Sequence, residues 1–120
     1  MIGIDLLPKE LKARSVSQRE IVLAYDDALK ALDIIIQSDW AFLGWEAWLK
    51  YPDGKVGHIE DYQGTVSIEQ EKDETWNDYK KRGYDFVKKT IIQDQLKWEK
   101  DPRSNDHQLF FCITPISSKA

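Results

Sequence analysis

The sequence predicts an α+β domain in which two helices pack on an antiparallel sheet of about four strands. Two long segments carry apolar residues at helical spacing, and the segments between and after them alternate or are apolar throughout, as strands do. A Pro-Asp-Gly turn at 52–54 joins two of these strands directly. With 120 residues, 42% hydrophobic and 32% charged, residues 1–120 fit a single domain with a packed core.

The first predicted helix covers residues 17–37. Ser17 and Glu20 have the Ser-x-x-Glu spacing of a capping box, in which each side chain satisfies a free backbone N–H group of the other. From Ile21 to Ile35 apolar residues return every three or four positions, and charged residues fill the positions between them. This spacing is typical of a helix with one buried face.

Residues 40–51 are predicted as a strand, with a buried helix as the alternative because their apolar residues are too dense to fix a period. In a strand the odd-numbered residues would face the core. The opposite face would then carry three large aromatic side chains: Trp40, Phe42 and Trp48. A return strand at 56–62 and a further strand at 65–69 complete a predicted three-strand meander.

The second predicted helix begins near Thr75, after an acidic run that suits the positive end of a helix. Gly83 falls on its apolar stripe, which indicates that another backbone packs closely there. Residues 108–114 are apolar on both faces, which is typical of a central strand. Near the N-terminus, Ile2 and Ile4 leave open a short edge strand.

Composition disfavours several classes of function. The chain has 17 Lys and Arg against 21 Asp and Glu, a net charge of −4, which disfavours a nucleic-acid binder. Asp5 and Pro8 come too early for a signal peptide, and no stretch of about 18 apolar residues is present, so we expect a cytoplasmic protein without membrane contact. One cysteine, Cys112, and two histidines cannot form the usual four-ligand zinc site, so we expect no metal and no cofactor.

The sequence is predicted not to encode an enzyme. In the sharpest catalytic hypothesis, His58 and His107 act as acid and base in RNA cleavage. However, only Lys55 and Arg103 lie in the same segments to hold a phosphate, and no Gly-rich phosphate loop, nucleophile elbow or His-Glu-x-x-His segment is present. Cys112 lies in an apolar run, so we interpret it as a core residue whose thiol pKa is raised.

Charge is distributed unevenly along the chain. Residues 53–79 hold eight acidic and two basic residues, and residues 80–103 hold eight basic and four acidic ones. Exposed aromatic residues beside an acidic surface favour a protein interface, although the acids could simply be solvated and the rings covered by a helix. The predicted partner-binding residues are Trp48, Glu60, Asp61, Tyr62, Glu69, Glu71, Asp73 and Glu74.

A small, acidic, aromatic-rich α+β domain of this kind resembles bacterial immunity proteins against contact-dependent-inhibition or colicin-type toxins. The resemblance is one of class and is carried by WEAWLKYPDG at 45–54, GTVSIE at 64–69 and LFFCIT at 109–114. It implies tight binding of a cognate toxin domain, often a nuclease, whose basic cleft is plugged by acidic side chains or whose active site is covered.

Two alternative functions stay open at this point. One is sequestration of a nucleotide signal by stacking aromatic rings, with phosphates held by Lys80, Lys81 and Arg82. The other is hydrolysis by the two histidines. The sequence leaves the oligomeric state and the order of the strands undetermined.

Overall fold

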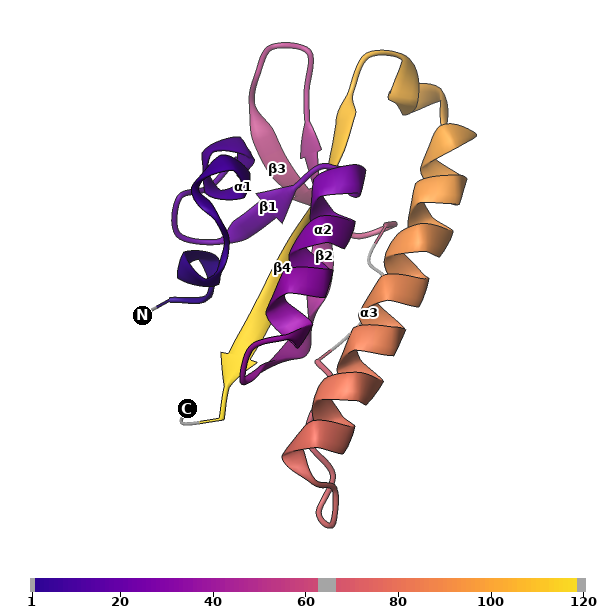
Figure 1. The fold of residues 1–120 in the computed structure, drawn as a ribbon. Coiled ribbons are helices and arrows are strands. Elements are labelled where there is room, and N and C mark those ends of the chain that lie inside the picture. The colour runs from indigo at the N-terminus through magenta and orange to yellow at the C-terminus, as the bar shows by residue number, and fades with distance from the viewer. Residues whose placement is uncertain (1, 63–66, 119–120) are drawn as a thin grey trace.

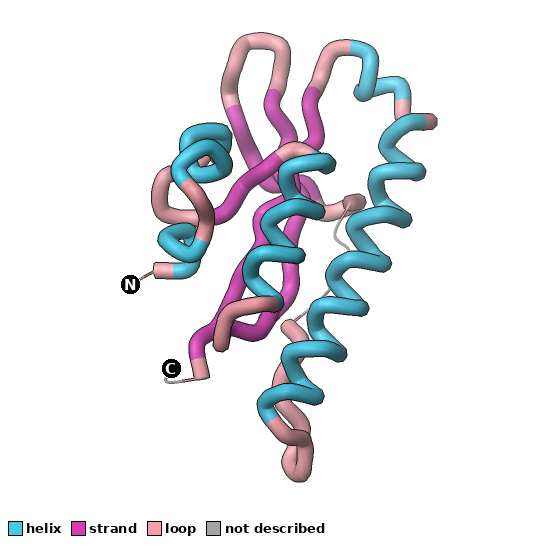
Figure 2. The backbone as a smooth tube through the Cα atoms, viewed as in Figure 1, coloured by secondary structure: helices cyan, strands magenta, loops and turns pink. Residues whose placement is uncertain are grey.

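Two long helices lie on one face of a four-stranded antiparallel sheet in the computed structural model, which describes residues 2–62 and 67–118 (Figure 1). The helices are α2, Tyr25–Ile36, and α3, Trp76–Glu99, and Figure 2 shows them side by side in front of the strands. The strands are β1 Ile21–Leu23, β2 Trp40–Lys50, β3 Val56–Ile59 and β4 Gln108–Ser117. The predicted α+β fold class is confirmed.

The C-terminal strand β4 lies in the interior of the sheet, as its apolar sequence predicts. The strand order is β1-β4-β2-β3, so β4 has a neighbour on each side. It pairs with β2 from Gln108 to Ser117, whereas β1 covers only the stretch Phe111–Ile113. The first part of β4 therefore runs past the end of β1.

β2 is a strand as predicted, but a bulge changes which side chains face the helices. The register shifts between Phe42 and Gly44, where Gly44 has a φ of 151°. Phe42 consequently turns into the core and is fully buried, and Trp40 packs partly against it. The prediction that these two rings lie on the open face is therefore wrong, because strict alternation fails at a bulge.

The close approach predicted at Gly83 is confirmed. A Cβ atom at this position would lie 3.1 Å from the carbonyl oxygen of Phe42. Glycine thus allows the backbone of α3 to approach the bulged part of β2. Further along the same helix, Thr90 Oγ1 accepts a hydrogen bond from Trp45 Nε1 at 2.8 Å, and both residues are buried.

The first helix begins eight residues later than predicted. Ser17 Oγ accepts hydrogen bonds from the N–H groups of Arg19 and Glu20, each at 3.1 Å, and so forms a local turn instead of a helix cap. The chain then enters β1, and α2 starts only at Tyr25. In sequence this turn resembles a helix start, because both use the same serine acceptor.

Three predicted strands differ in the structure. In place of an edge strand at Ile2 and Ile4, the N-terminal region forms a 3-10 helix and a short α-helix: η1 Gly3–Leu6 and α1 Lys9–Arg14. β3 ends at Ile59, and of the predicted strand at 65–69, residues 65–66 lie outside the described residues while 67–69 form no strand. The fourth strand is β1 instead.

Candidate functional site

The candidate site lies on the sheet face that points away from α2 and α3. Alternation places Trp48 of β2, His58 of β3 and Phe110 of β4 on this face, and the register sets Trp48 between the other two. The ring centroids of Trp48 and His58 are 4.8 Å apart. We call these three residues the aromatic row. His58 is exposed, and Trp48 and Phe110 are partly exposed, so the row is open to solvent.

A carboxylate, Glu46, lies beside the aromatic row. Glu46 Oε1 accepts a hydrogen bond from Trp48 Nε1 at 3.4 Å and lies 3.4 Å from His58 Nδ1. Burial, together with the negative charges of Glu20 and Glu46, raises the pKa of the Cys112 thiol to about 12. Glu46 is the register partner of Cys112 across β2 and β4, and Cys112 is a buried core residue as predicted.

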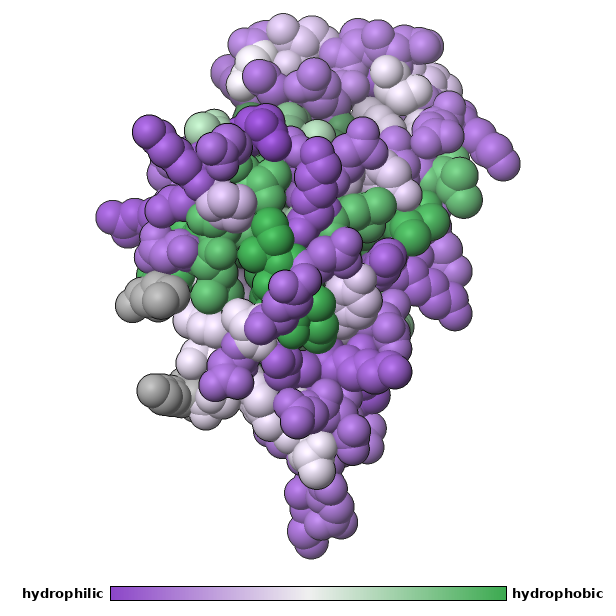
Figure 3. Space-filling view, in the orientation of Figure 1, coloured by the Kyte–Doolittle hydropathy of each residue, from purple (hydrophilic) through white to green (hydrophobic). Residues whose placement is uncertain are grey.

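The predicted acidic residues do not form one patch, because they are divided between the two ends of α3. Asp61 and Tyr62 contact its C-terminal end, where Lys97 Nζ donates to the carbonyl of Asp61 at 2.6 Å. The others lie in the loop before the helix, a hydrophilic projection in Figure 3: Glu69, Glu71, Asp73 and Glu74. At 1.5 Å per residue, α3 separates the two groups by about 30 Å.

Glu74 is paired with Arg82 beside the start of α3. The guanidinium donates from Nε and Nη2 to the two carboxylate oxygens at 2.7 and 2.8 Å, and Glu71 N–H donates to Glu74 Oε1 at 3.0 Å. These hydrogen bonds, that of Arg82 first, lower the pKa of Glu74 to about 2. Glu69, Glu71 and Asp73 remain exposed and are the acids of this loop that a partner can reach.

Tyr62 anchors the chain after β3 instead of lying on the surface. It is 1% exposed, its O–H donates to Asp101 Oδ2 at 2.9 Å, and its ring meets Trp98 edge-on at 5.6 Å. Burial raises the pKa of Tyr62 to about 12. Arg103 Nη2 bridges Asp101 and Asp61 at 2.8 and 2.7 Å. Among the predicted contacts in this segment, only Glu60 is exposed without such ties.

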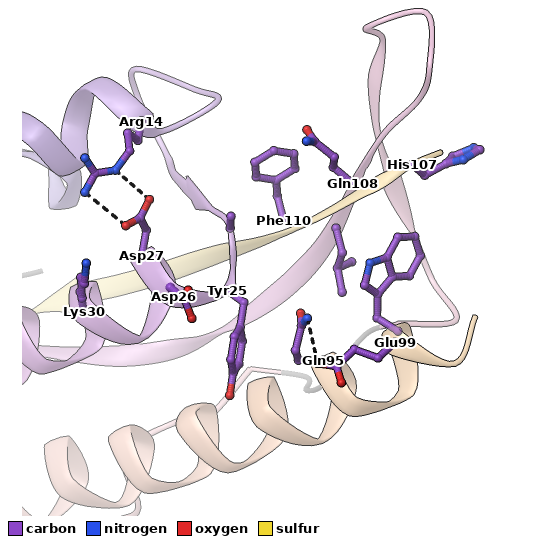
Figure 4. A pocket seen from close by; sticks show the side chains of 13 residues that line it. Arg14, Tyr25, Asp26, Asp27, Lys30, Gln95, Glu99, His107, Gln108 and Phe110 are labelled. Atoms are coloured by element: carbon purple, nitrogen blue, oxygen red, sulfur yellow. Dashed lines mark hydrogen bonds and ion pairs between the residues drawn. The ribbon is translucent and has the colours of Figure 1, made fainter. Parts of the chain in front are cut away.

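A groove that the sequence did not indicate opens where α2 begins, α3 ends and β4 begins (Figure 4). Its volume is about 1110 Å³. On one wall Arg14 donates to both carboxylate oxygens of Asp27, at 2.8 and 3.2 Å. Four separate segments build the groove, so no local pattern could reveal it. Of the side chains predicted from the sequence as candidates for chemistry, His107 lines it.

The two histidines have different surroundings. His58 contacts Trp48 and Glu46 on the open face of the sheet. His107 Nδ1 lies 2.5 Å from Asp106 Oδ1, and its ring is 5.2 Å from that of Tyr51. Within the described parts of the chain, these contacts have no residue in common.

Across residues 2–62 and 67–118, no group of three or more His, Cys, Asp or Glu side chains is arranged to hold a metal ion. None of the described helices is long and apolar enough to cross a membrane. No protein-family model, no curated protein and no solved structure matches this chain.

Proposed function

We propose that this chain is a protein-binding inhibitor of the immunity-protein type, which neutralises a toxin domain through the open face of its sheet. The aromatic row is the observation that carries the proposal. The solvent face of an antiparallel sheet is normally polar, so a row of partly exposed rings across three strands favours a bound partner. Tryptophan suits such a contact, since it covers a large area and keeps a polar N–H.

The charge near the row supports a basic partner. Glu46 lies beside the row on the same sheet face, where it complements the basic cleft that a nuclease needs to hold its substrate. The exposed acids of the loop before α3 are too distant to share this contact. Their role in the proposal is to attract the partner over a longer range and speed its approach.

The first experiment is co-expression of the chain with the product of its neighbouring gene, scored for toxicity, complex formation and rescue of growth. We expect a one-to-one complex in which Trp48→Ala speeds dissociation about 30-fold, the usual size for a central anchor. Phe86→Ala is the matched control, because this ring is 42% exposed on α3, in the other layer of the molecule. Equal effects of the two changes, or no rescue, would refute the proposal.

The steering role has its own test. Charge reversal of Glu69, Glu71 and Asp73 to lysine should slow association about tenfold at low salt and leave dissociation unchanged. Glu74 is kept, because its change would also break the ion pair with Arg82. Association rates that match those of the wild type at low salt would remove steering from the proposal while leaving the aromatic contact intact.

The contacts of the basic residues do not favour the nucleotide-signal alternative. Arg82 is bound to Glu74, and Lys80 Nζ donates to the carbonyl of Ser38. A phosphate site built on these cations would have to break both contacts first. The aromatic row lies in the other layer of the molecule from this part of α3. Phe86 does line a shallow pocket with Lys81 and Arg82, but Asp78 and Asp85 line it too, and their negative charges oppose a bound phosphate.

A further inference from the structure

The first three residues of β4 have no strand beside them on the side of β1. β1 ends at Leu23, paired with Phe111, and the chain then turns at Ala24 into α2. Gln108–Phe110 pair with β2 on one side only. Their other side lines the groove described above.

Hydrogen bonds at β1 show which backbone groups point to that free side. Val22 N–H donates to Ser15 Oγ at 3.0 Å, and Val22 C=O accepts from Val16 N–H at 3.0 Å. Val22 therefore directs both groups away from β4. Because directions alternate along an antiparallel strand, the neighbouring Leu23 directs both of its groups toward Phe111.

The same alternation applies along β4. Phe111 bonds toward β1, so Leu109, two residues earlier, also directs its N–H and C=O to that side. His107, two residues before Leu109, fits this alternation, because its N–H donates to the carbonyl of Arg103 at 2.8 Å and not to β2. With β1 already ended, both polar groups of Leu109 face the groove, and no described residue takes the place of a strand there.

The groove walls are chemically suited to an extended chain with a basic side chain. Figure 4 shows Tyr25 and Asp26 at the start of α2 and Glu99 at the end of α3, around the edge of β4. The carboxylates of Asp26 and Glu99 form no ion pair with a described residue, although Gln95 donates to Glu99 at 3.4 Å. Lys30, one helical turn after Asp26, also lines the groove without such a pair, so the two carboxylates outnumber the unpaired cation. Phe110 adds an apolar surface above the edge.

We propose that this groove binds an extended polypeptide segment of a partner protein, which adds to the sheet along Gln108–Phe110 in the place that β1 leaves at Ala24. One residue of the segment exchanges two backbone hydrogen bonds with Leu109. Its side chain turns to the helix side, where a Lys or Arg packs its stem on Tyr25 and its charge meets the two carboxylates. The adjacent residues are apolar and contact Phe110. This site does not depend on the proposed function.

The test is a titration of the labelled protein with capped heptapeptides, followed through the backbone amide signals. The probe is Thr-Thr-Val-Lys-Val-Thr-Thr, compared with the same peptide carrying a central Glu and with one methylated on the backbone nitrogen of Lys. We expect the Lys peptide to shift the amides of Leu109 and Phe110. N-methylation, which removes the donor to the Leu109 carbonyl, should weaken binding at least about fivefold, and Glu should weaken it by a similar factor.

Variants separate a specific site from general edge pairing. Asp26→Asn combined with Glu99→Gln should abolish the preference for Lys over Glu. Asp53→Asn combined with Glu60→Gln removes two exposed acids elsewhere and should leave that preference unchanged. The amide spectrum itself shows whether each variant is folded. Shifts confined to the outer edge of β3, Val56–Ile59, or equal binding of the methylated peptide, would overturn the proposal.

Discussion

Trp45 and Trp48 lie three residues apart on β2, on opposite faces of the sheet. Trp45 is 3% exposed, donates to Thr90 at 2.8 Å, and its ring centroid is 5.0 Å from that of Phe111. Trp48 is partly exposed and donates to Glu46 at the longer distance of 3.4 Å. A tryptophan thus stabilises the fold at position 45, where its N–H has a buried acceptor. At position 48, where no buried acceptor is present, the ring is left partly open to solvent.

Removing the buried ring of Trp45 should have the largest effect on stability. Trp45→Ala leaves a cavity between the sheet and α3, and we expect a loss of about 3–5 kcal/mol in the free energy of unfolding, measured by urea denaturation. The chain would then be at or near its unfolding threshold at 37 °C. A loss under about 1 kcal/mol would show that the covered face tolerates a void and would break the contrast between the faces.

The distance between α3 and β2 can be tested at Gly83. Valine here would press against the carbonyl of Phe42, already 3.1 Å from a Cβ atom, and should cost about 2 kcal/mol by forcing the two elements apart. The Tm reports the loss of stability, and near-UV circular dichroism reports the changed packing of the aromatic side chains. The same helix already contains a buried valine, Val87, so valine itself is compatible with α3. A wild-type Tm for Gly83→Val would therefore contradict the close contact between α3 and Phe42.

The buried hydrogen bond of Trp45 should contribute a smaller amount. Thr90→Val keeps the shape but removes the acceptor, leaving the indole N–H unsatisfied at an expected cost of about 1–2 kcal/mol. A double-mutant cycle with Trp45→Phe isolates the interaction free energy between the two side chains. The double variant should lose less unfolding free energy than the sum of the two single variants. Strict additivity would contradict a coupled pair.

On the open face, Trp48→Ala should change stability by about 1 kcal/mol or less, because the ring is partly exposed already. Urea denaturation of this variant beside Trp45→Ala gives the contrast in one experiment. A loss as large as that of Trp45→Ala would mean that the aromatic row is structural, and would withdraw its role as a binding surface.

The smallest effect concerns the ion pair at the start of α3. The pKa of Glu74 falls from 4.5 to about 2 on folding, so its contribution is fully present above pH 4.5 and is lost as the pH falls toward 2. Glu74→Gln lacks this contribution at every pH. The stability difference between wild type and variant should therefore shrink below pH 4.5, and a constant difference would contradict the pair.

Local pattern was sufficient for much of the fold. The apolar spacing of α3, the two-sided apolar sequence of β4 and the turn after β2 each reflect what neighbouring residues alone determine. The errors arose where distant contacts decide. β1 is a strand because Ile21–Leu23 pair with β4 some ninety residues later, and the bulge at Gly44 changed the alternation that had placed Phe42 outside.

The candidate site was predicted in part for the same reason. Trp48 was assigned to the open face because alternation holds from Trp45 onward. The acidic residues were grouped by nearness in sequence, but α3 separates them in space. The burial of Tyr62 and the ion pair of Glu74 depend on partners 39 and 8 residues away. A run of charged residues in the sequence gives the number of charges. Which of them are already paired within the protein, as Glu74 is with Arg82, is visible only in the fold.

The central place of β4 also bears on how the chain folds during synthesis. β1 and β2 are not neighbours in the sheet, since β4 lies between them. Among the elements of residues 2–62 and 67–118, β4 is the last to be made. Until β4 leaves the ribosome, β1 and the β2–β3 pair share no hydrogen bonds within the sheet. The apolar faces of α2 and α3 then have only part of the sheet to pack against. Folding should therefore be late and cooperative, completed by insertion of one strand.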